Sequence, residues 1–227
     1  MQWDEADAAE MLSAVAAGRI GYDAPLGGAT EDVSADFARL RWALLEPEIE
    51  RYRQVGAIAG RVIAETCRAI EPGMTEHQVA ADLMGRAMAA GCQPVVALIA
   101  ADERAYRYRH PLPTDRRVEK HVMVVLGCSK WGLGISATRI VSFGQPPAEL
   151  RDKHAACCYV DACLNLETRP GAGVGEIFRK AVAAYAERGY PDQWRLHHQG
   201  GATGYAARDY KGTLECDEVV REHQAFA

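Results

Sequence analysis

Two adjacent histidines followed by two glycines are the residues of this chain best suited to chemistry. His197 and His198 stand in RLHHQGGATGY, the stretch at residues 195–205. An imidazole titrates near neutral pH, so each can bind a metal ion, transfer a proton or serve as a hydrogen-bonding group in a turn. Gly200 and Gly201 allow main-chain amides to approach a ligand closely, or permit only a tight turn.

Further candidate groups lie outside this stretch. His110 stands in RYRHPLPT, where two prolines stiffen the main chain around it. A histidine with a pKa near neutrality can take up and return a proton within one catalytic cycle. The guanidinium groups of Arg109 and Arg139 can hold a carboxylate, although Arg139 can equally pair with an acid across a sheet.

Composition limits the class of protein. The chain has 227 residues, of which 48% are apolar, enough for a sizeable core. A net charge of -5 gives no general attraction to nucleic acid. A local group of basic residues is interpreted as an anion-facing rim or a solvated loop: Arg104, Arg107, Arg109, Arg116 and Arg117.

Location and thiol chemistry follow from the same sequence. It shows neither a basic, apolar leader pattern nor a long uncharged apolar stretch, so we expect a cytoplasmic protein with no membrane partner. The seven cysteines include no CxxC pair, which argues against a thiolate zinc site and favours buried thiols in a reducing compartment.

An internal repeat organises the chain. One helix is predicted from Pro47 to the EPG at residues 71–73, and a second from Thr75 to Gly91. The same order of helix, Pro-Gly, helix and glycine returns 98 positions later, ending at Gly189. The pattern predicts two duplicated helix-helix-strand halves with a cleft between them.

Strands are expected after each helical pair. The predicted strands are 94–103, a hairpin over 121–144 that turns at Trp131-Gly132, and 217–227. Residues 1–37 are interpreted as an extension or the remnant of an N-terminal domain, and 38–227 as the main domain. Because the sequence stops within an apolar strand at Ala227, we interpret the domain as truncated at its C-terminal end.

From about Ala38 onward the chain resembles the catalytic domain of the creatinase, aminopeptidase P and methionine aminopeptidase superfamily (peptidase family M24). The resemblance rests on five motifs in order: EPGMTE, YRHPLPT, VVLGCSKWGLGISATRIVSFG, TRPG and HHQGGATGY. It implies an α+β pita-bread fold, with duplicated halves around a curved, mainly antiparallel sheet.

The resemblance also implies a degenerate metal site. Peptidases of this superfamily hold two metal ions with two aspartates, one histidine and two later glutamates. The aspartate positions fall on Val125 and Ser136, the histidine on His198, and the glutamates at or beyond Ala227. Valine cannot ligate a metal, so we expect no metal cofactor. A mononuclear site of the three histidines is a less favoured alternative, because adjacent residues rarely direct both imidazoles to one ion.

The resemblance leaves a metal-free enzyme open. Creatinase works without metal, with a histidine as acid and base while carboxylates hold its cationic substrate, and His110 falls at that histidine's position. The leading hypothesis is therefore a homodimeric, metal-independent C–N hydrolase or lyase acting on a small amino-acid-like or guanidino substrate, or a short peptide. Its catalytic residues would be His110 and His198, and its substrate-binding residues His197, Arg109, Arg139, Gly200 and Gly201.

Two other hypotheses remain. The lost aspartates favour a catalytically inactive pseudo-peptidase that serves as a binding module. A metallo-aminopeptidase with an altered site is the lesser alternative.

Overall fold

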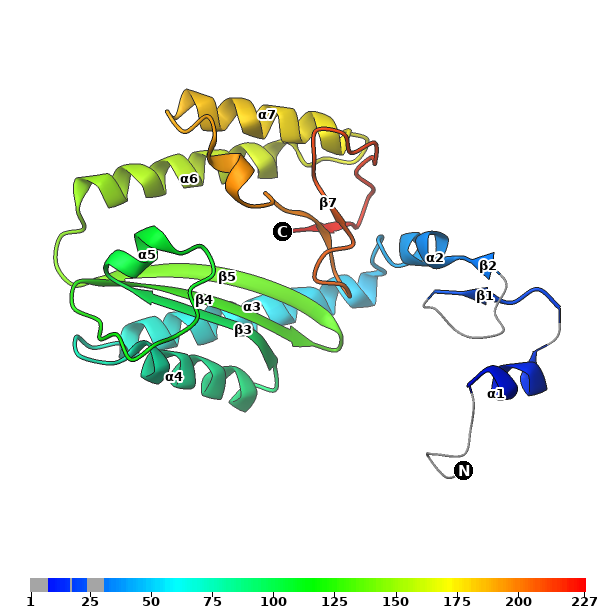
Figure 1. The fold of residues 1–227 in the computed structure, drawn as a ribbon, viewed down its shortest axis with the longest axis horizontal. Coiled ribbons are helices and arrows are strands. Elements are labelled where there is room, and N and C mark those ends of the chain that lie inside the picture. Colours follow the sequence, from blue (N-terminus) through cyan, green and yellow to red (C-terminus); the bar gives the residue numbers. More distant parts are fainter. Residues whose placement is uncertain (1–7, 17, 24–30) are drawn as a thin grey trace. The chain divides into compact units, whose positions relative to one another are not determined.

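The computed structural model describes residues 8–16, 18–23 and 31–227 (Figure 1). The chain separates into two compact units, Met1–Ala43 and Leu44–Ala227, whereas the sequence prediction started the main domain at residue 38. Residues 1–7, 17 and 24–30 of the predicted N-terminal extension lie outside the described residues.

The first unit consists of short elements. They are α1 (Ala8–Val15), β1 (Gly21–Tyr22), β2 (Glu31–Asp32) and α2 (Ser34–Leu40). The two strands pair in parallel over two residues each, and α2 has no buried residue. In the described part of the chain, none of the helices combines the length and the apolar character that a membrane span requires.

The second unit begins with the first of the two predicted halves. Its elements are α3 (Glu46–Ala69), α4 (Glu76–Ala89), β3 (Gln93–Ala101), α5 (Glu103–Arg107), β4 (His121–Lys130) and β5 (Leu133–Ser142). Thr75 caps α4 as predicted: its hydroxyl accepts the N–H of Gln78 at 3.1 Å, and the Gln78 side chain accepts the N–H of Thr75 at 2.8 Å.

The second half repeats the helical pair. It contains α6 (Ala148–Glu167), α7 (Val174–Glu187), the short 3₁₀ helix η1 (Gln193–Leu196), β6 (Gly201–Thr203), β7 (Tyr210–Lys211) and β8 (Ala225–Phe226). The glycines that follow the helices have matching left-handed φ angles, +94° and +71° at Gly73 and Gly91, and +88° and +83° at Gly171 and Gly189. The predicted duplication is confirmed.

The strands form two antiparallel sheets in this unit, in the orders β3-β4-β5 and β7-β6-β8. The β4-β5 hairpin turns at Trp131 and Gly132 as predicted, with φ angles of 54° and 82°. The two sheets are joined where the N–H of Gly134 donates to the carbonyl of Gly204 at 3.0 Å.

The predicted strand at 217–227 is wrong for most of its length, because only Ala225–Phe226 is a strand. The main-chain groups of Val220 pair instead with Gly171 and Ala172, at the loop before α7. His223 has a φ of 60°, a left-handed conformation that interrupts an extended chain.

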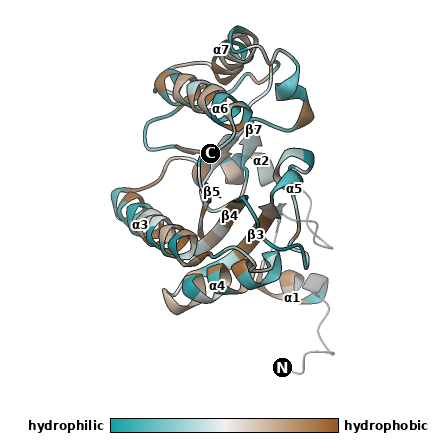
Figure 2. Ribbon diagram, turned by 90° about the vertical axis from the view of Figure 1, so that its left-hand side faces the viewer, coloured by the Kyte–Doolittle hydropathy of each residue, from teal (hydrophilic) through white to brown (hydrophobic). Residues whose placement is uncertain are grey.

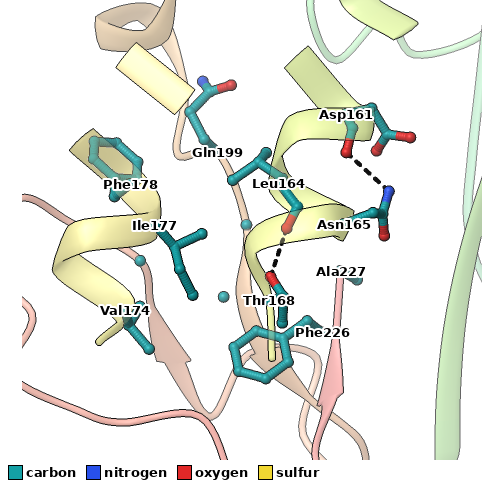
Figure 3. Close-up of a pocket in the computed structure, with 13 residues that line it drawn as sticks. Asp161, Leu164, Asn165, Thr168, Val174, Ile177, Phe178, Gln199, Phe226 and Ala227 are labelled. Carbon is teal, nitrogen blue, oxygen red and sulfur yellow. Dashed lines mark hydrogen bonds between the residues drawn. The ribbon is translucent and has the colours of Figure 1, made fainter. Parts of the chain in front are cut away.

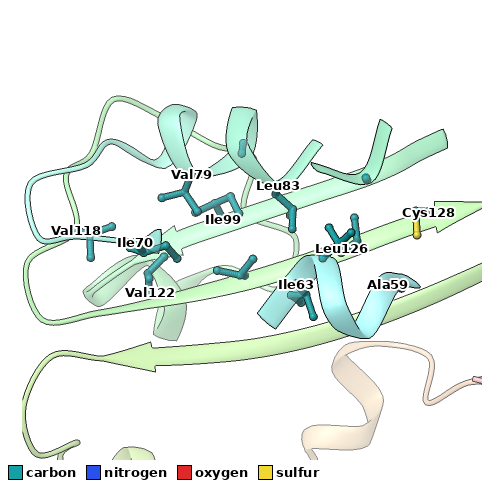
Figure 4. Close-up of a cluster of buried hydrophobic side chains, with 14 of the residues drawn as sticks. Ala59, Ile63, Ile70, Val79, Leu83, Ile99, Val118, Val122, Leu126 and Cys128 are labelled. Carbon is teal, nitrogen blue, oxygen red and sulfur yellow. The ribbon is translucent and has the colours of Figure 1, made fainter. Parts of the chain in front are cut away.

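Alternation along β4 separates the core from the opposite face of the sheet. Val122, Val124, Leu126 and Cys128 are buried in the main hydrophobic cluster with residues of α3 and α4 (Figure 4). Figure 2 shows these two helices on one side of the three-stranded sheet, with α6 and α7 beyond its other side. The odd-numbered residues of β4, including Val125, therefore face away from the core helices.

Candidate active site

The structure brings the three predicted histidines together from two distant parts of the sequence. The ring centroids of His110 and His197 are 4.8 Å apart, and those of His197 and His198 are 4.0 Å apart. His110 and His198 are exposed and His197 is half-buried, so a ligand can reach the cluster. These three residues are called the histidine cluster below.

A buried carboxylate positions the loop that carries His110. Glu76, at the start of α4, is fully buried and accepts hydrogen bonds from the N–H of Ala101 at 2.7 Å and the Nε of Arg104 at 2.9 Å. Its other oxygen accepts from the N–H and the hydroxyl of Thr114, at 2.9 and 2.6 Å. Arg104 also donates to the carbonyl of Leu112 at 2.9 Å, so both ends of the His110 loop are held.

A second carboxylate fixes the chain just before α5. Asp102 has a φ of 52° and accepts the main-chain N–H groups of Glu119, Lys120 and His121 at 2.8–3.1 Å. Burial acts to raise the pKa of Asp102, but these donors outweigh it and lower the pKa overall. The carboxylate thus remains ionised and ties α5 to the start of β4.

The segment that carries His197 and His198 is attached on both sides. Arg109 donates to the side-chain oxygen of Gln193 at 2.9 Å, which connects the His110 loop to η1. The Gln199 amide donates to the carbonyl of His197 at 2.7 Å and accepts the hydroxyl of Tyr185, on α7, at 2.5 Å. Arg109 therefore helps to hold His110 near His197 and His198, through its hydrogen bond to the neutral side chain of Gln193.

The tautomer of His197 follows from its contact with the next residue. Its Nδ1 lies 2.5 Å from the carbonyl oxygen of His198. A carbonyl oxygen only accepts, so Nδ1 carries a proton. In neutral His197, Nε2 is then the proton acceptor.

The surroundings of His198 are electropositive. Although the residue is exposed, partial desolvation of the ring lowers the pKa of His198, and four neighbouring basic groups lower it further. These groups are His197, Arg208, Lys211 and His110. His198 is therefore held in its neutral form to a lower pH than a free imidazole.

The two glycines serve main-chain packing. A Cβ at Gly200 would lie 2.5 Å from the main-chain oxygen of Ala227, and one at Gly201 would lie 2.0 Å from that of Tyr210. The N–H of Gly201 donates to Ala227 at 3.0 Å. It is therefore engaged within the sheet instead of being directed at a substrate.

The positions expected to carry metal-binding aspartates share one face of the sheet. Val125 pairs with Thr138 and Gly127 with Ser136, so the side chains of Val125 and Ser136 project to the same side, away from the core helices. A dinuclear site needs bridging carboxylates, which a valine and a serine cannot supply. Among the described residues, no group of three or more histidine, cysteine, aspartate or glutamate side chains could hold a metal ion. Val125 and Ser136 therefore do not fit the two bridging-carboxylate positions that the resemblance assigns to them.

Arg139 is not brought to the histidines. It pairs with Val124 on β4, which places it on the α3 side of the sheet, where it lies close enough to Cys67 to act on the pKa of that thiol. Its guanidinium donates a hydrogen bond to the carbonyl of Thr138 at 2.7 Å. The expected carboxylate clamp by Arg139 has no geometric support in this arrangement.

A pocket of about 150 Å³ lies next to the histidine segment (Figure 3). Its lining includes Leu164, Ile177 and Phe178 from α6 and α7, together with Gln199, Gly200 and Gly201. None of the three histidines lines it. The pocket is distinct from the cluster, and its lining also includes the polar residues Asp161, Asn165 and Thr168.

The sequence matches the family model of metallopeptidase family M24 over residues 50–226. The chain belongs to this family.

Individual proteins resemble the chain in sequence or in fold. A probable dipeptidase PepE of Mycobacterium tuberculosis is 26% identical over 185 residues, which are 80% of this chain and 49% of the relative. The X-Pro aminopeptidase of Thermotoga maritima MSB8 superposes with a TM-score of 0.84 at 20% identity, covering 96% of this chain and 67% of that structure. The prolidase of Pyrococcus furiosus gives 0.85 at 19% identity, covering 96% and 69%. The chain spans about half the length of the curated relatives that it matches.

Four residues near the histidine cluster were not predicted from the sequence as part of the site. Glu76 and Gln193 position the histidines, while Arg208 and Lys211 set the charge around His198. Glu76 could have been found from the sequence, because it belongs to the EPGMTE motif and directly follows the capping Thr75. Nothing in the spacing of the other three pointed to this site.

Replacement of Glu76 by Gln should destabilise the protein by about 3 kcal/mol, because it breaks a buried ion pair with Arg104 and weakens four hydrogen bonds. Urea unfolding measures the change. Glu71→Gln is the control, since Glu71 is exposed, and it should change the free energy of unfolding by less than about 0.5 kcal/mol. Equal effects of the two substitutions would contradict the assigned role of Glu76.

The lowered pKa of His198 predicts a pH dependence of stability. As the pH falls below about 6.5, the unfolded chain protonates this imidazole before the folded chain does. The free energy of unfolding should therefore decrease from that pH down to the folded-state pKa. His198→Gln should flatten this part of the curve, measured by urea unfolding between pH 5 and 8. An unchanged curve in His198→Gln would show that His198 is not held neutral by its surroundings.

Proposed function

We propose that this M24 protein is a metal-independent hydrolase that cleaves a C–N bond in a small amino-acid-like substrate or short peptide. The observation that carries the proposal is the contact between His110 and His197, which joins imidazoles from the two halves of the fold at an accessible surface. The face where family aspartates are expected carries Val125 and Ser136 instead.

His110 is proposed as the general acid and base. It accepts a proton from a water molecule as the water oxygen bonds to the substrate carbon, and it returns a proton to the departing nitrogen as the C–N bond breaks. The exposed ring of His110 is open to solvent, and its loop is held by Glu76 and Arg104. A fixed loop supports this role because proton transfer requires the donor and acceptor at hydrogen-bond distance.

The other two histidines are proposed to orient the reacting groups. Neutral His197 presents Nε2 as an acceptor, since Nδ1 is bonded to the His198 carbonyl. His198 remains neutral over a wider pH range than a free imidazole because of its basic neighbours. A neutral imidazole can polarise a carbonyl through its N–H without adding a further positive charge to the cluster.

A binding module is the second candidate function. Two positions expected to carry the bridging carboxylates of a dinuclear site hold Val125 and Ser136, which supports a protein without that chemistry. The same accessible histidines can hold a ligand without converting it. The two candidates differ in one observable, which is turnover of a bound compound.

Hydrolysis of a panel of dipeptides, including Xaa-Pro dipeptides, and of guanidino acids tests the proposal in buffer containing EDTA. We expect turnover of at least one compound to persist with EDTA, and His110→Ala to lower kcat by about 10² to 10⁴. The control is His154→Ala, which removes an exposed histidine from α6 and should leave kcat unchanged. Thermal unfolding of both variants verifies that they are folded.

Full activity in folded His110→Ala would refute the proton-transfer role. Binding of a panel compound without turnover would instead favour the binding module.

A further inference from the structure

His121 is a buried imidazole that the proposed reaction does not use. The residue is the first of β4 and is 6% exposed. Within the part of the chain that the structure describes, both ring nitrogens are shielded from solvent and neither has a hydrogen-bond partner. An imidazole carries at least one N–H in each of its protonation states, so at least one buried donor is unsatisfied. A buried donor without an acceptor destabilises the conformation that buries it.

Tyr106 covers this imidazole on the face of the sheet opposite to the core helices. Its ring lies edge-on to that of His121, with centroids 5.3 Å apart and an interplanar angle of 89°. Tyr106 belongs to α5, a helix of 5 residues of which none is buried, and it is itself 41% exposed. The cover is therefore thin, and rotation of Tyr106 away from the sheet would admit water to the ring.

The two ends of α5 are held unequally. Before the helix, Asp102 is fixed by three main-chain N–H groups, and Arg104 in its first turn is bound by Glu76. The next turn, residues 105–108, ends with the Tyr108 N–H donating to the carbonyl of Arg104 at 3.1 Å. Residues 105–108 are called the lid below. His110 follows the lid by two residues, so movement of the lid also affects how firmly His110 is held.

Asp102 is the acidic group that faces His121. Its carboxylate accepts the main-chain N–H of His121 at 3.1 Å, and charge on the His121 ring contributes to the lowered pKa of Asp102. The same oxygens also accept the main-chain N–H groups of Glu119 and Lys120, at 3.0 and 2.8 Å, while the side chains of these two residues are exposed. Opposite His121 on β5 is Ser142, which carries no charge. The carboxylate thus attracts a charged ring without accepting a hydrogen bond from it.

Cations approach the same place from two other elements. Arg116, in the loop before β4, is ion-paired with this carboxylate at 4.0 Å and with Glu103 of α5 at 3.9 Å. On α6, the Nζ of Lys153 lies 5.6 Å from the centroid of the Tyr106 ring and is paired with Glu149 at 2.7 Å. A proton on the buried imidazole would therefore add a charge beside an acid that Arg116 already shares.

We propose that residues 105–108 form an acid-sensitive lid over His121, which opens when this imidazole is protonated. With the lid closed, a proton on His121 leaves two buried N–H donors without acceptors, whereas water accepts both when the lid is open. The open state therefore binds the proton more tightly, and acid shifts the population towards it. The lid does not require turnover at His110, so this inference and the proposed function can fail independently.

Amide hydrogen exchange of the whole chain, read by mass spectrometry over residues 103–110, tests the lid. Rates measured at about pH 5.5 and about pH 7.5 are divided by the intrinsic rates of the unfolded sequence, which removes the chemical effect of pH. We expect the normalised rate in the lid to rise about fivefold or more at the lower pH, because the Tyr108 N–H is released. Peptides from the core helix α4 should change less than about twofold. Equal normalised rates in the lid at the two pH values would overturn the inference.

His121→Leu removes the titrating ring and its unsatisfied nitrogens, so the lid should exchange equally slowly at both pH values. The matched control is His223→Asn, which removes an exposed imidazole far along the chain and keeps a residue suited to the left-handed φ of 60° at that position. It should retain the full acid response. Thermal unfolding verifies that both variants are folded. A retained acid response in folded His121→Leu would overturn the inference.

Carbethoxylation by diethyl pyrocarbonate tests the cover directly, including the case in which His121→Leu does not fold. The reagent modifies accessible neutral imidazoles, so His121 should react slowly at about pH 7 in the unaltered chain. Tyr106→Ala should raise its rate of modification about tenfold or more, measured by peptide mass spectrometry. Tyr108→Ala is the control, because the exposed Tyr108 ring stacks on Arg104 instead, and it should leave the rate unchanged. Equal rates in the two tyrosine variants would overturn the inference.

Discussion

The buried carboxylate of Glu76 connects the folding core to the histidine cluster. It lies at the start of α4, a helix whose other buried residues belong to the main hydrophobic cluster. From this position it holds the end of β3, the side chain of Arg104 and the loop that ends at Thr114. A carboxylate at a helix N-terminus also interacts favourably with the helix dipole. The location of His110 is thus determined by the same element that forms the core.

The second half of the fold supplies the partner histidines through weaker local structure. Between α7 and β6 the chain is held by the short helix η1 and by side-chain contacts of Gln193 and Gln199. Hydrogen bonds from Arg109 and Tyr185 connect this segment to the His110 loop and to α7. The relative placement of the imidazoles therefore depends on a few polar contacts, while each half has apolar packing of its own.

The sequence predicted the elements of the fold correctly where local patterns and the internal repeat agreed. The capping Thr75, the glycines that end four helices and the hairpin turn at Trp131 each have a strong local preference, and the structure follows them. The segment 217–227 resembled a strand by composition, but its pairing partner is the loop before α7, which no local pattern reveals. M24 membership is confirmed as well.

The site was less predictable because its properties depend on contacts distant in the sequence. The histidines could be selected by residue type and by the family motifs. The position of Arg139 on the α3 side of the sheet follows from strand register, and the engagement of Gly201 follows from pairing with Ala227. The basic groups that act on the pKa of His198 include Arg208 and Lys211, and of these only Lys211 lies in the β6-β7 ladder.

The central proposal is that the histidine cluster of this M24 chain acts without a dinuclear metal centre. Equilibrium dialysis against Mn(II) or Co(II), followed by elemental analysis, measures it most directly. The account predicts far less than one metal ion per chain, and no difference between the unaltered chain and His198→Ala. One or two tightly bound ions per chain that are lost in His198→Ala would contradict it.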